Sequence, residues 1–594
     1  MCGIVVTNTL NNLTKAELLS RIKRRGPDHQ NIRQYGDLYI GHSRLSILDL
    51  DVRSNQPFES KTYVLTFNGE IYNYKELRIE LKQKGHKFST NSDTEVLLAM
   101  YREYGKECLH RIRGMFAFCI HNMEENSLFF ARDITGQKPL YYFFNDNKIS
   151  ISSSLMLIYD LHKPKFNYTA LEEFFRFRYI ISEDSTPFIN CSKLNPGYCG
   201  TVNLDDFSMS IEPYVDLSED SYGGSFEEAK TALGELIQDS VKDRLISDVP
   251  LGVFLSGGLD SSLIAYYATK HSEELSTFSL GFDGLESNEL KGARAVAKHL
   301  KTRHYECVVK PEEVSSALDD FFLAYEEPFA DGSAIPSLIL SKFAKSQMTV
   351  ALSGDGADEL FLGYNRYEYF SRLLWQQYIP LKMRYLFSYL SDIFRSKSWS
   401  RYLRFLGSRN MKELYYGVVS SFDTREFKSL PDSFGSDFNK SHPIKSAAIW
   451  DKEHYLPNDI NQKVDRASMF FGLEVRSPFL DKRITDFASA LPERYMYSER
   501  RKKHVLRSLL YDLMPSDLYT NKKSGFTAPL EIWIESLFKD EIIEYINGTD
   551  LLELPFIDID GMRNKCNEHF TGKRKHTNML WRVLVYKRWR QAYV

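Results

Sequence analysis

The sequence predicts an α+β layered domain followed by an α/β domain built on a parallel sheet, with a mainly helical C-terminal part. Three observations lead to this fold class. Short strand-like segments dominate about the first 200 of the 594 residues. From about residue 250 to 355, apolar strand patterns alternate with helical ones, which is typical of a parallel sheet. From about residue 360 onward, the apolar residues mostly follow helical spacing.

Local pairing of strands is expected in the N-terminal domain. Strand-like patterns occur at 116–120, 128–132, 140–144 and 148–152, and helical patterns at 74–84 and 93–104. Turn-forming residues separate the strands of each successive pair, which predicts two antiparallel hairpins. Strands that pair locally, with helices packed outside them, form an α+β layered structure.

A polar stretch at residues 206–224 separates the two predicted domains. It is rich in acidic residues, Ser and Gly and shows little periodicity, so we expect a linker. Ser225 and Glu228 then have the spacing of a capping box, and apolar residues recur at helical spacing after them. The expected domains are therefore residues 1–205 and 225–594.

Two glycine-rich loops follow predicted strands in the second domain. Strand patterns occur at 253–255, 277–280, 304–309 and 349–352, with a helical pattern at 288–300. The loop SGGLDSS, residues 256–262, follows the first strand, and SGDGADE, residues 353–359, follows the last. Because ligands of open parallel sheets bind at the carboxyl ends of the strands, we expect both loops to line one site.

Composition excludes several classes of protein. The net charge is −3 and the pI about 6.6, so the whole chain has no basic footprint for nucleic acid. No run of 18 or more apolar residues is present, and the N-terminus lacks the pattern of a secretory signal. The seven cysteines form no CxxC pair, which argues against a disulfide framework or a zinc cluster. We therefore expect a cytoplasmic protein without an integral membrane segment; the oligomeric state stays open, with a homodimer among the options.

Cys2 stands directly after the initiator methionine. Removal of that methionine would leave a free α-amine, which titrates near neutrality and can act as the base for its own thiol. A single cysteine is usually inert, but this one opens a series of motifs. They are CGI at 2–4, RGPD at 25–28, GHSRLSI at 41–47, FNGEIYN at 67–73, SDTE at 92–95, ARD at 131–133 and GQKPLY at 136–141. Together they resemble the class II, N-terminal-nucleophile glutamine amidotransferases, which implies an αββα sandwich and a glutaminase.

The residue types suit that chemistry. The Cys2 thiolate would attack the amide of glutamine, while the Asn68 side chain and the Gly69 N–H would stabilise the developing oxyanion. The substrate carries its own carboxylate and ammonium, which require opposite charges. By the resemblance, glutamine contacts Arg44 through its carboxylate, Glu70 and Asp93 through its ammonium, and also Leu45, Ile47, Asn68 and Gly69.

The loop at 256–262 lacks the GK[ST] ending of a Walker A motif and resembles the pyrophosphate-binding loop of ATP pyrophosphatases. The second loop has Glu359 where a dinucleotide fingerprint requires glycine, which excludes NAD and FAD. The residues expected to bind ATP are Leu255, Ser256, Gly257, Gly258, Asp260, Ser261, Leu280, Ser353 and Gly354. Asp260 and Asp358 are candidate ligands of Mg²⁺, although Asp358 also suits a helix N-cap. Lys503 is a candidate for binding pyrophosphate, and a solvated lysine in the basic run 500–503 is an equally good reading.

A class II glutaminase joined to an ATP-pyrophosphatase domain resembles the glutamine-hydrolysing asparagine synthetase family over essentially the whole chain. The resemblance implies three substrates: glutamine, ATP and aspartate. The β-carboxylate of aspartate would attack the α-phosphate of ATP to give β-aspartyl-AMP and pyrophosphate. Ammonia released at Cys2 would then pass through an internal tunnel and displace AMP.

One departure leaves the acceptor open. Many members have glutamate at the position of Asp355, where the carboxylate is a candidate base for the ammonia step. Aspartate is one methylene shorter, and a displacement of about 1 Å can cost roughly a hundredfold in rate. A related amidotransferase that amidates a uronic acid of a surface polysaccharide is therefore an alternative. An inactive scaffold is disfavoured because Cys2, Asn68 and Asp260 are all present.

Overall fold

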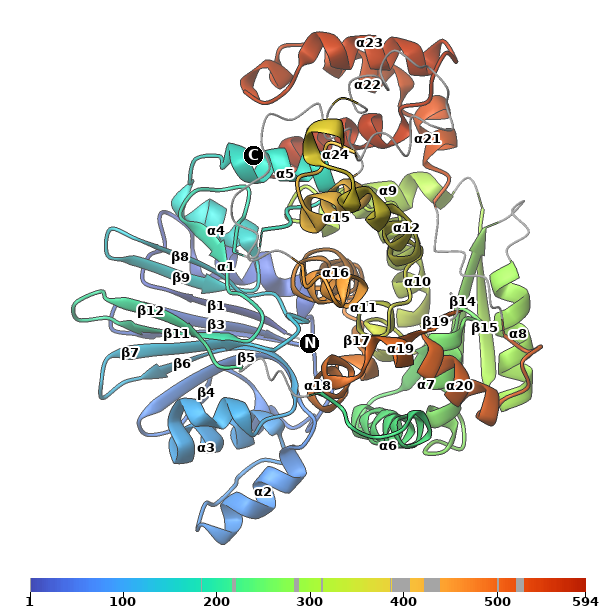
Figure 1. Cartoon of the computed structure of the whole chain (residues 1–594). Coiled ribbons are helices and arrows are strands. Elements are labelled where there is room, and N and C mark those ends of the chain that lie inside the picture. Colours follow the sequence, from blue (N-terminus) through green and yellow to red (C-terminus); the bar gives the residue numbers. More distant parts are fainter. Residues whose placement is uncertain are drawn as a thin grey trace.

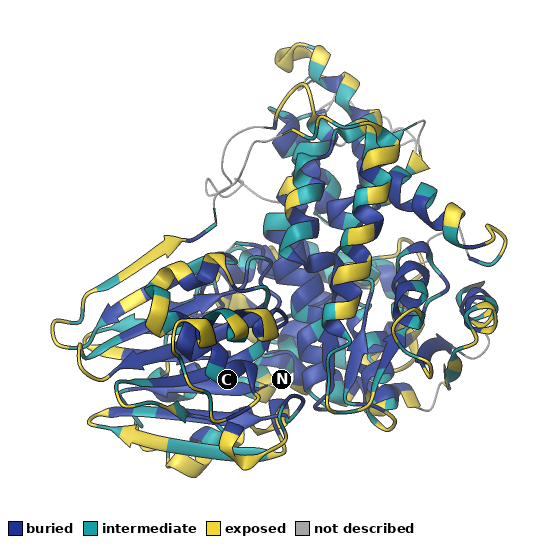
Figure 2. Cartoon of the chain, turned by 90° about the horizontal axis from the view of Figure 1, so that it is seen from below, coloured by how far each residue is buried: buried dark blue, intermediate teal, exposed yellow. Residues whose placement is uncertain are grey.

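The computed structural model describes residues 2–182, 184–215, 221–282, 288–310, 313–384, 386, 406–420, 438–498, 501–519 and 528–594. The strand-rich N-terminal half lies on one side of a set of helices that includes α10 (Ala334–Lys345), α11 (Ala357–Leu360) and α16 (Pro443–Trp450) (Figure 1). A separate parallel sheet, which carries β14 (Ser276–Phe282) and β15 (Arg303–Val309), lies on the opposite side (Figure 1). Buried residues concentrate in the sheets and in these central helices, and exposed residues cover the outer surface (Figure 2).

Two six-stranded antiparallel sheets form the N-terminal half. The first has the order β10 (Cys191–Lys193), β8 (Tyr141–Asn145), β9 (Lys148–Ser152), β1 (Gly3–Thr7), β3 (Leu38–Arg44), β2 (His29–Tyr35). The second has the order β12 (Met209–Pro213), β11 (Tyr198–Asn203), β7 (Ser127–Arg132), β6 (Gly114–Asn122), β5 (Tyr63–Ile71), β4 (Phe58–Glu59). Both predicted hairpins are confirmed, because β6 pairs with β7 and β8 pairs with β9.

Apolar side chains from both sheets meet in one cluster. Ile4 and Val6 of β1 and Val64 of β5 are fully or almost fully buried in it. Helices α1 (Lys15–Ile22) and α4 (Leu155–His162) contact the first sheet, and α3 (Asp93–Tyr104) contacts the second and packs on α2 (Tyr74–Gln83). Two sheets packed face to face between helices form the αββα sandwich that the resemblance implied.

The predicted linker is partly wrong. Residues 209–213 form β12, which pairs with β11 at the edge of the second sheet. The sequence of β12, MSIEP, alternates apolar and polar residues within a polar stretch that favours a linker, but four of the five residues are exposed, so the alternation marks no buried face of the strand. Its backbone pairing with β11 holds it, and the boundary between the two domains stays a prediction.

A five-stranded parallel sheet is the centre of the second half. Its order is β15 (Arg303–Val309), β14 (Ser276–Phe282), β13 (Leu251–Phe254), β16 (Val350–Leu352), β17 (Glu474–Arg476). The helices before and between these strands are α6 (Phe226–Arg244), α7 (Leu259–Thr269), α8 (Asn288–Leu300), α9 (Val314–Ala324) and α10 (Ala334–Lys345). The capping box of Ser225 and Glu228 is present at the start of α6, and the parallel sheet is confirmed.

The C-terminal part is mainly helical, as predicted. Its helices are α11 (Ala357–Leu360), α12 (Asn365–Leu373), α15 (Met411–Val419), α16 (Pro443–Trp450), the π-helix η7 (Asp451–Asn461), α17 (Gln462–Met469), α18 (Lys482–Ala490), α19 (Glu493–Met496), α20 (His504–Leu513), α21 (Leu530–Ser536), α22 (Lys539–Asn547), α23 (Ile559–Phe570) and α24 (Thr577–Tyr593). A small hairpin, β18 (Tyr497–Ser498) and β19 (Arg501–Lys502), precedes α20.

The two halves share one hydrophobic core. Helix α5 (Tyr168–Phe177), which lies between β9 and β10 in the chain, packs against α24 at the other end of the chain (Figure 1). The Phe175 ring lies 5.5 Å from that of Tyr586, and Arg582 Nη1 donates to the Phe175 carbonyl at 2.6 Å. Residues near the end of α5 are therefore held by the second half of the molecule.

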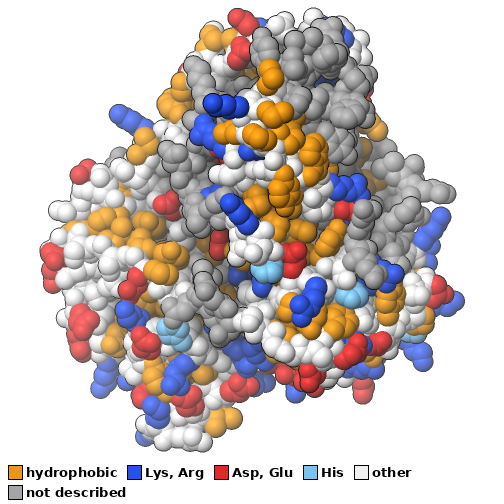
Figure 3. Space-filling model, viewed as in Figure 1, with side chains coloured by type: hydrophobic (Ala, Val, Ile, Leu, Met, Phe, Trp, Pro, Cys, Tyr) orange, Lys and Arg blue, Asp and Glu red, His pale blue; other side chains and the backbone are white. Residues whose placement is uncertain are grey.

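Two further features concern the charges on the surface and the length and apolarity of the helices. Acidic and basic side chains are interspersed over the face in Figure 3, as expected for a net charge near zero. Among the described helices, none is both long and apolar enough to cross a membrane.

Candidate active sites

Cys2 is buried immediately before β1. Its backbone nitrogen donates to Asn68 Oδ1 at 3.0 Å, and its carbonyl accepts from Arg25 Nε at 3.0 Å. Burial raises the pKa of the Cys2 thiol, an effect partly offset by the nearby Leu45 N–H. A thiol with a raised pKa requires a base to become a thiolate, and a free α-amine at residue 2 would be the nearest one.

Asn68 and Gly69 lie next to each other on β5. Asn68 is fully buried, and its Nδ2 has no hydrogen-bond partner among the described residues, so this donor is available to an oxyanion. A Cβ on Gly69 would lie 2.1 Å from the Met115 carbonyl oxygen, so only glycine fits. The motifs predicted that Cys2, Asn68 and Gly69 lie together, and the structure brings Cys2 and Asn68 into contact.

Glu70 and Asp93 lie in a group of buried acids. Burial raises the pKa of Asp93 to about 6, although its Oδ2 accepts a hydrogen bond from Ile71 N at 2.9 Å. Burial and the charge of Asp93 raise the pKa of Glu70 well above its ordinary value. Glu474 of β17 belongs to the same group. Arg476, also on β17, lies beside these acids, with its Nη2 at 3.5 Å from Glu70 Oε1. The motifs indicated Glu70 and Asp93 for this site, but no role here was predicted for Glu474 and Arg476, although their segment GLEVRSPFLD at 472–481 also resembles the family.

Arg44 makes different contacts from those predicted. Its two terminal nitrogens donate to the carbonyls of Leu48, Asp49 and Asp51 and to Asn55 Oδ1, at 2.6 to 3.2 Å. The guanidinium therefore braces the loop at 48–55, and its pairing with the carboxylate of glutamine stays a prediction. Leu45 and Ile47 are buried in the same cluster as Phe67.

Arg25 joins the Cys2 region to the second half of the chain. Its Nη1 and Nη2 lie 2.7 and 3.0 Å from the two carboxylate oxygens of Asp465 on α17. Lys138 Nζ is 3.6 Å from the same carboxylate. Burial alone would raise the pKa of Asp465, but these two cations hold it at about 2. The pair is therefore ionised at neutral pH and fixes the backbone of Cys2 against α17.

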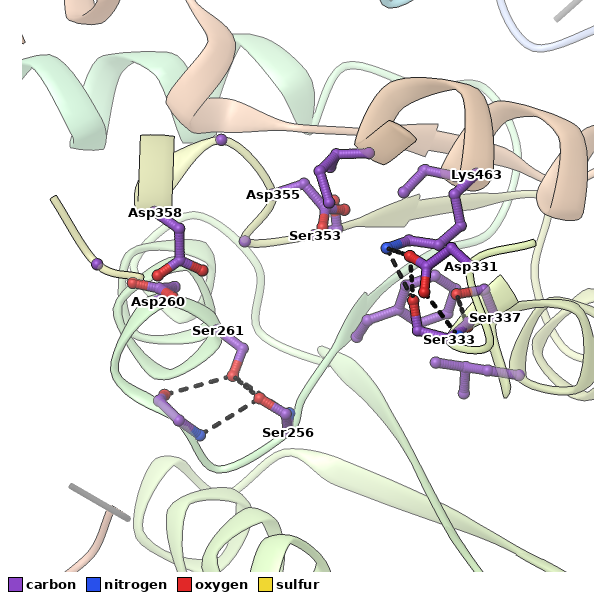
Figure 4. A pocket seen from close by; sticks show the side chains of 18 of the residues that line it. Ser256, Asp260, Ser261, Asp331, Ser333, Ser337, Ser353, Asp355, Asp358 and Lys463 are labelled. Atoms are coloured by element: carbon purple, nitrogen blue, oxygen red, sulfur yellow. Dashed lines mark hydrogen bonds and ion pairs between the residues drawn. The ribbon is translucent and has the colours of Figure 1, made fainter. Parts of the chain in front are cut away.

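Both glycine-rich loops line one cavity of about 590 Å³ (Figure 4). In the first loop, Ser256 Oγ and Ser261 Oγ are 3.0 Å apart, and the Gly258 N–H donates to Ser256 Oγ at 3.3 Å. The lining also includes Leu255, Asp260, Ser353, Gly354, Asp355 and Asp358. Gly257 and Leu280 are not part of it. Gly257 is instead required for the close contact of the loop with α8, because a Cβ there would lie 2.3 Å from Ala293 N.

Lys503 joins the two loops. Its Nζ lies 2.7 Å from Asp260 Oδ2 and 2.7 Å from Asp358 Oδ1. Burial opposes a charge on Lys503, but the two carboxylates raise its pKa above the ordinary value. The lysine is therefore a buried cation at the loops, whereas Arg501 in the same basic run is exposed. The reading of Asp358 as an N-cap is wrong, because Gly356 caps α11.

Gly363 was missed by sequence reasoning. A Cβ at this position would lie 1.9 Å from Asp358 Oδ1 and 2.1 Å from Lys503 Cε. Only glycine lets the lysine and the aspartate meet there. No local motif marks it, because the contact joins residues that are 140 positions apart in the chain.

The residues at the loops fit Mg²⁺ bound together with a nucleotide. Among the described residues, no group of three or more His, Cys, Asp or Glu side chains could hold a metal ion alone. Mg²⁺ is usually bound by one or two carboxylates together with substrate phosphates and water. Asp260 and Asp358 supply such a pair of carboxylates at the cavity wall.

The far end of the cavity holds a second group of charges. Lys463 Nζ is 3.2 Å from Asp331 Oδ2 and 3.0 Å from Ser333 Oγ. This group faces Asp260 and Asp358 across the cavity, and Asp355 lies between the two (Figure 4). Sequence reasoning missed Asp331 and Lys463, because neither belongs to a glycine-rich loop.

A small cavity of about 20 Å³ lies between the two halves. Its walls come from the GQKPLY segment and Lys193 on one side and from η7 and α17 on the other. A space of that size holds one water-sized molecule.

Two family models match this chain, one in each half. A family model described as a glutamine amidotransferase domain matches residues 1–215, and one described as asparagine synthase matches residues 232–591. The chain belongs to the asparagine synthase family. Glutamine-hydrolysing asparagine synthetase 1 of Bacillus subtilis is 32% identical, covering 99% of this chain and 96% of its own. A putative asparagine synthetase of Mycobacterium bovis is 31% identical, covering 96% and 92%. Asparagine synthetase 3 of Bacillus subtilis is 29% identical, covering 86% and 84%.

Membership of the asparagine synthase family confirms the resemblance seen in the motifs. It also confirms the fold class: an N-terminal amidotransferase sandwich, a parallel-sheet domain of the ATP-pyrophosphatase type and a largely helical C-terminus. The chain is thus a glutamine amidotransferase and an ATP-using ligase of this family.

Proposed function

We propose that this chain is a glutamine-dependent asparagine synthetase that converts aspartate, ATP and glutamine into asparagine, AMP, pyrophosphate and glutamate. The observation that carries the proposal is the contact of Lys503 with Asp260 and Asp358, because it joins both glycine-rich loops at one cavity. End-to-end similarity to a glutamine-hydrolysing asparagine synthetase supports the same activity.

Glutamine hydrolysis is assigned to the residues around Cys2. With the initiator methionine removed, the α-amine of Cys2 takes the thiol proton and the thiolate attacks the side-chain amide of glutamine. The Nδ2 of Asn68, which is buried and without a partner among the described residues, donates to the oxyanion together with the Gly69 N–H. Ammonia leaves after proton return, and water releases glutamate from the thioester. The buried carboxylates of Glu70 and Asp93 balance the ammonium of the substrate.

Activation of the acceptor is assigned to the large cavity. The N–H groups of the loop at 256–262, at the start of α7, suit the phosphates of ATP. A carboxylate oxygen of aspartate forms a bond to the α-phosphorus, and the bond to the bridging oxygen of the β-phosphate breaks. Lys503 lies where it can neutralise the departing pyrophosphate. Mg²⁺, held by Asp260 and Asp358, would supply further charge neutralisation at the phosphates.

Ammonia transfer connects the sites. The small cavity between the halves marks one point on the path from Cys2 toward the larger cavity. Ammonia attacks the β-carbonyl carbon of the aspartyl adenylate, AMP leaves, and a base removes one proton from the attacking nitrogen. Asp355 is the candidate base, because it lies between the phosphate-binding end and the far end (Figure 4).

The test is an acceptor assay with purified protein, glutamine and Mg-ATP. Aspartate should stimulate pyrophosphate release and yield AMP and asparagine in equal amounts, whereas galacturonate should leave the rate at its background level. Pyrophosphate release that responds to galacturonate and ignores aspartate would select the polysaccharide amidotransferase. A chain that releases no pyrophosphate with either acid would contradict the assignment of the cavity.

A further inference from the structure

Arg178 reaches the synthetase cavity from the amidotransferase half of the chain. It follows directly after α5 and lies in the left-handed region, with φ of 80°. Its carbonyl accepts from Ala330 N at 2.7 Å, immediately before Asp331. Among the described residues, the others that line the cavity all have numbers above 250. Arg178 thus contributes to the cavity from the amidotransferase half, although it belongs to neither glycine-rich loop and to no motif.

Arg178 adds a cation at the far end of the cavity. The charged and titratable side chains that face it are those of Asp331, Asp459, Tyr455 and Tyr179, with Lys463 next to Asp331. Burial and the charge of Asp331 raise the pKa of Asp459 well above its ordinary value. Although burial opposes its charge, Asp331 stays ionised, because Lys463 and Arg178 hold its pKa well below the usual range.

The side chains that line this end of the cavity include two cations, Arg178 and Lys463, and one carboxylate, Asp331, whereas Asp459 is not among its described lining residues. Lys463 already pairs with Asp331 at 3.2 Å, so Arg178 is not required to neutralise that carboxylate. Two cations face one anion in a cavity that also contains Ser333 and Ser337. A ligand with an anionic group placed here would restore neutrality, and a charge-assisted bond to arginine is one of the stronger polar contacts.

We propose that Arg178 is a specificity residue that binds a second carboxylate of the acceptor, remote from the carboxylate that is activated. The inference rests on the proposed function and names the acceptor class, which is a dicarboxylate. Aspartate has this form, with its β-carboxylate toward the phosphates and Asp355 and its α-carboxylate at Arg178. Its ammonium would lie near Asp331. A uronic acid has a single carboxylate, which the reaction uses, and would leave the charge of Arg178 unmatched.

The test uses the full-length enzyme with saturating Mg-ATP and ammonium chloride as nitrogen source, so that glutamine hydrolysis does not enter the rate. Arg178→Asn removes the cation and keeps a residue that tolerates the left-handed backbone. Arg178→Lys keeps a charge but loses the two-pronged geometry. The matched control is Arg176→Gln in the last turn of α5, two residues before Arg178, because Arg176 is buried, pairs with Glu172 and does not line the cavity. Thermal unfolding of each variant identifies any loss of folding.

The KM for aspartate should rise about 10- to 100-fold in Arg178→Asn, with partial recovery in Arg178→Lys and less than threefold change in Arg176→Gln. The KM for ATP should change much less than that for aspartate. Succinate, which has both carboxylates and no ammonium, should inhibit the wild-type enzyme competitively with aspartate, and its Ki should rise in Arg178→Asn.

Three results would overturn the inference. They are an unchanged KM for aspartate in folded Arg178→Asn, an equal rise in the KM values of aspartate and ATP, and a Ki for succinate that does not depend on Arg178 (absence of inhibition of the wild type included). Each leaves the proposed function standing, since the wild-type enzyme still uses aspartate. A wild-type enzyme that ignores aspartate overturns both.

Discussion

The amidotransferase site is assembled from residues between Cys2 and Asp93, with Glu474 and Arg476 added from β17. The synthetase cavity draws its side chains from Arg178 to Asn578. At the first site a thiol, an amide nitrogen and two acids are buried among sheet residues, and burial raises the pKa values of the thiol and both acids. At the second, cations and carboxylates lie next to one another around about 590 Å³ of space.

The difference follows from the ligands. Glutamine is small and has no net charge, so a closed site with isolated polar groups can orient it. ATP carries several negative charges, and its site needs backbone N–H groups, a lysine and acids that can hold a metal. This difference predicts that a substitution can impair the reaction at one site without impairing the reaction at the other.

The largest separation is expected from Cys2→Ala. Removal of the nucleophile should lower glutamine-dependent asparagine formation by at least about 1000-fold. Synthesis from ammonium chloride should stay within about threefold of wild type, because Cys2 does not line the synthetase cavity. Both rates can be followed by pyrophosphate release. Equal loss with the two nitrogen sources would show that the sites are not separable in this way.

Lys503→Met should impair the synthetase site and leave glutamine hydrolysis intact. It removes the cation between two carboxylates at the phosphate end, so adenylation should fall by about 100-fold or more. The readout is AMP formation with saturating aspartate, and glutamine hydrolysis without acceptor serves as the internal reference. Arg501→Ala is the control, since this arginine belongs to the same basic run and is exposed. If Arg501→Ala reduced AMP formation as much as Lys503→Met, the assignment within the run would be wrong.

Gly363→Ala tests the close approach at the same site. The new Cβ would lie 1.9 Å from Asp358 Oδ1 and must displace it or Lys503. A displacement near 1 Å should lower AMP formation by about 10- to 100-fold while the chain still folds. Gly223→Ala is a matched control, because no atom lies within 4 Å of its Cβ position. Wild-type rates in Gly363→Ala would contradict the geometry.

The smallest expected change is in the stability of the fold, in Asp93→Asn, and it depends on pH. The pKa of Asp93 is about 6 in the folded protein and 3.8 ordinarily, so the unfolded chain loses this proton first. Stability is therefore lost as pH rises from about 4 to 6, and the deficit persists above 6. The asparagine has no proton to lose, so this variant should be more stable than wild type by about 1–3 kcal/mol at pH 7 and no more stable at pH 4. Thermal unfolding at the two pH values measures the difference, and a variant less stable than wild type at pH 7 would refute it.

Much of the fold could be predicted from local patterns. Helices Asp93–Tyr104 and Asn288–Leu300 have the bounds that their apolar spacing indicated, and the capping box at Ser225 is present. Strand β12 was not predicted, although Met209 and Ile211 alternate with Ser210 and Glu212, because this short alternation lies in a polar stretch and the exposed strand depends on pairing with β11. Arg44 shows a limit of another kind: the motif indicated its importance, while its contacts depend on the fold of the following loop.

The sequence by itself determined the family, the two glycine-rich loops and the residues around Cys2, because these groups are close along the chain or occur in a fixed order of motifs. The tertiary structure alone decided that Lys503 reaches both loops, that Gly363 makes room for it and that Arg178 completes the cavity from the other half. These residues are far apart in sequence, and each has an ordinary local context. Their roles arise from packing between elements, which no local pattern records.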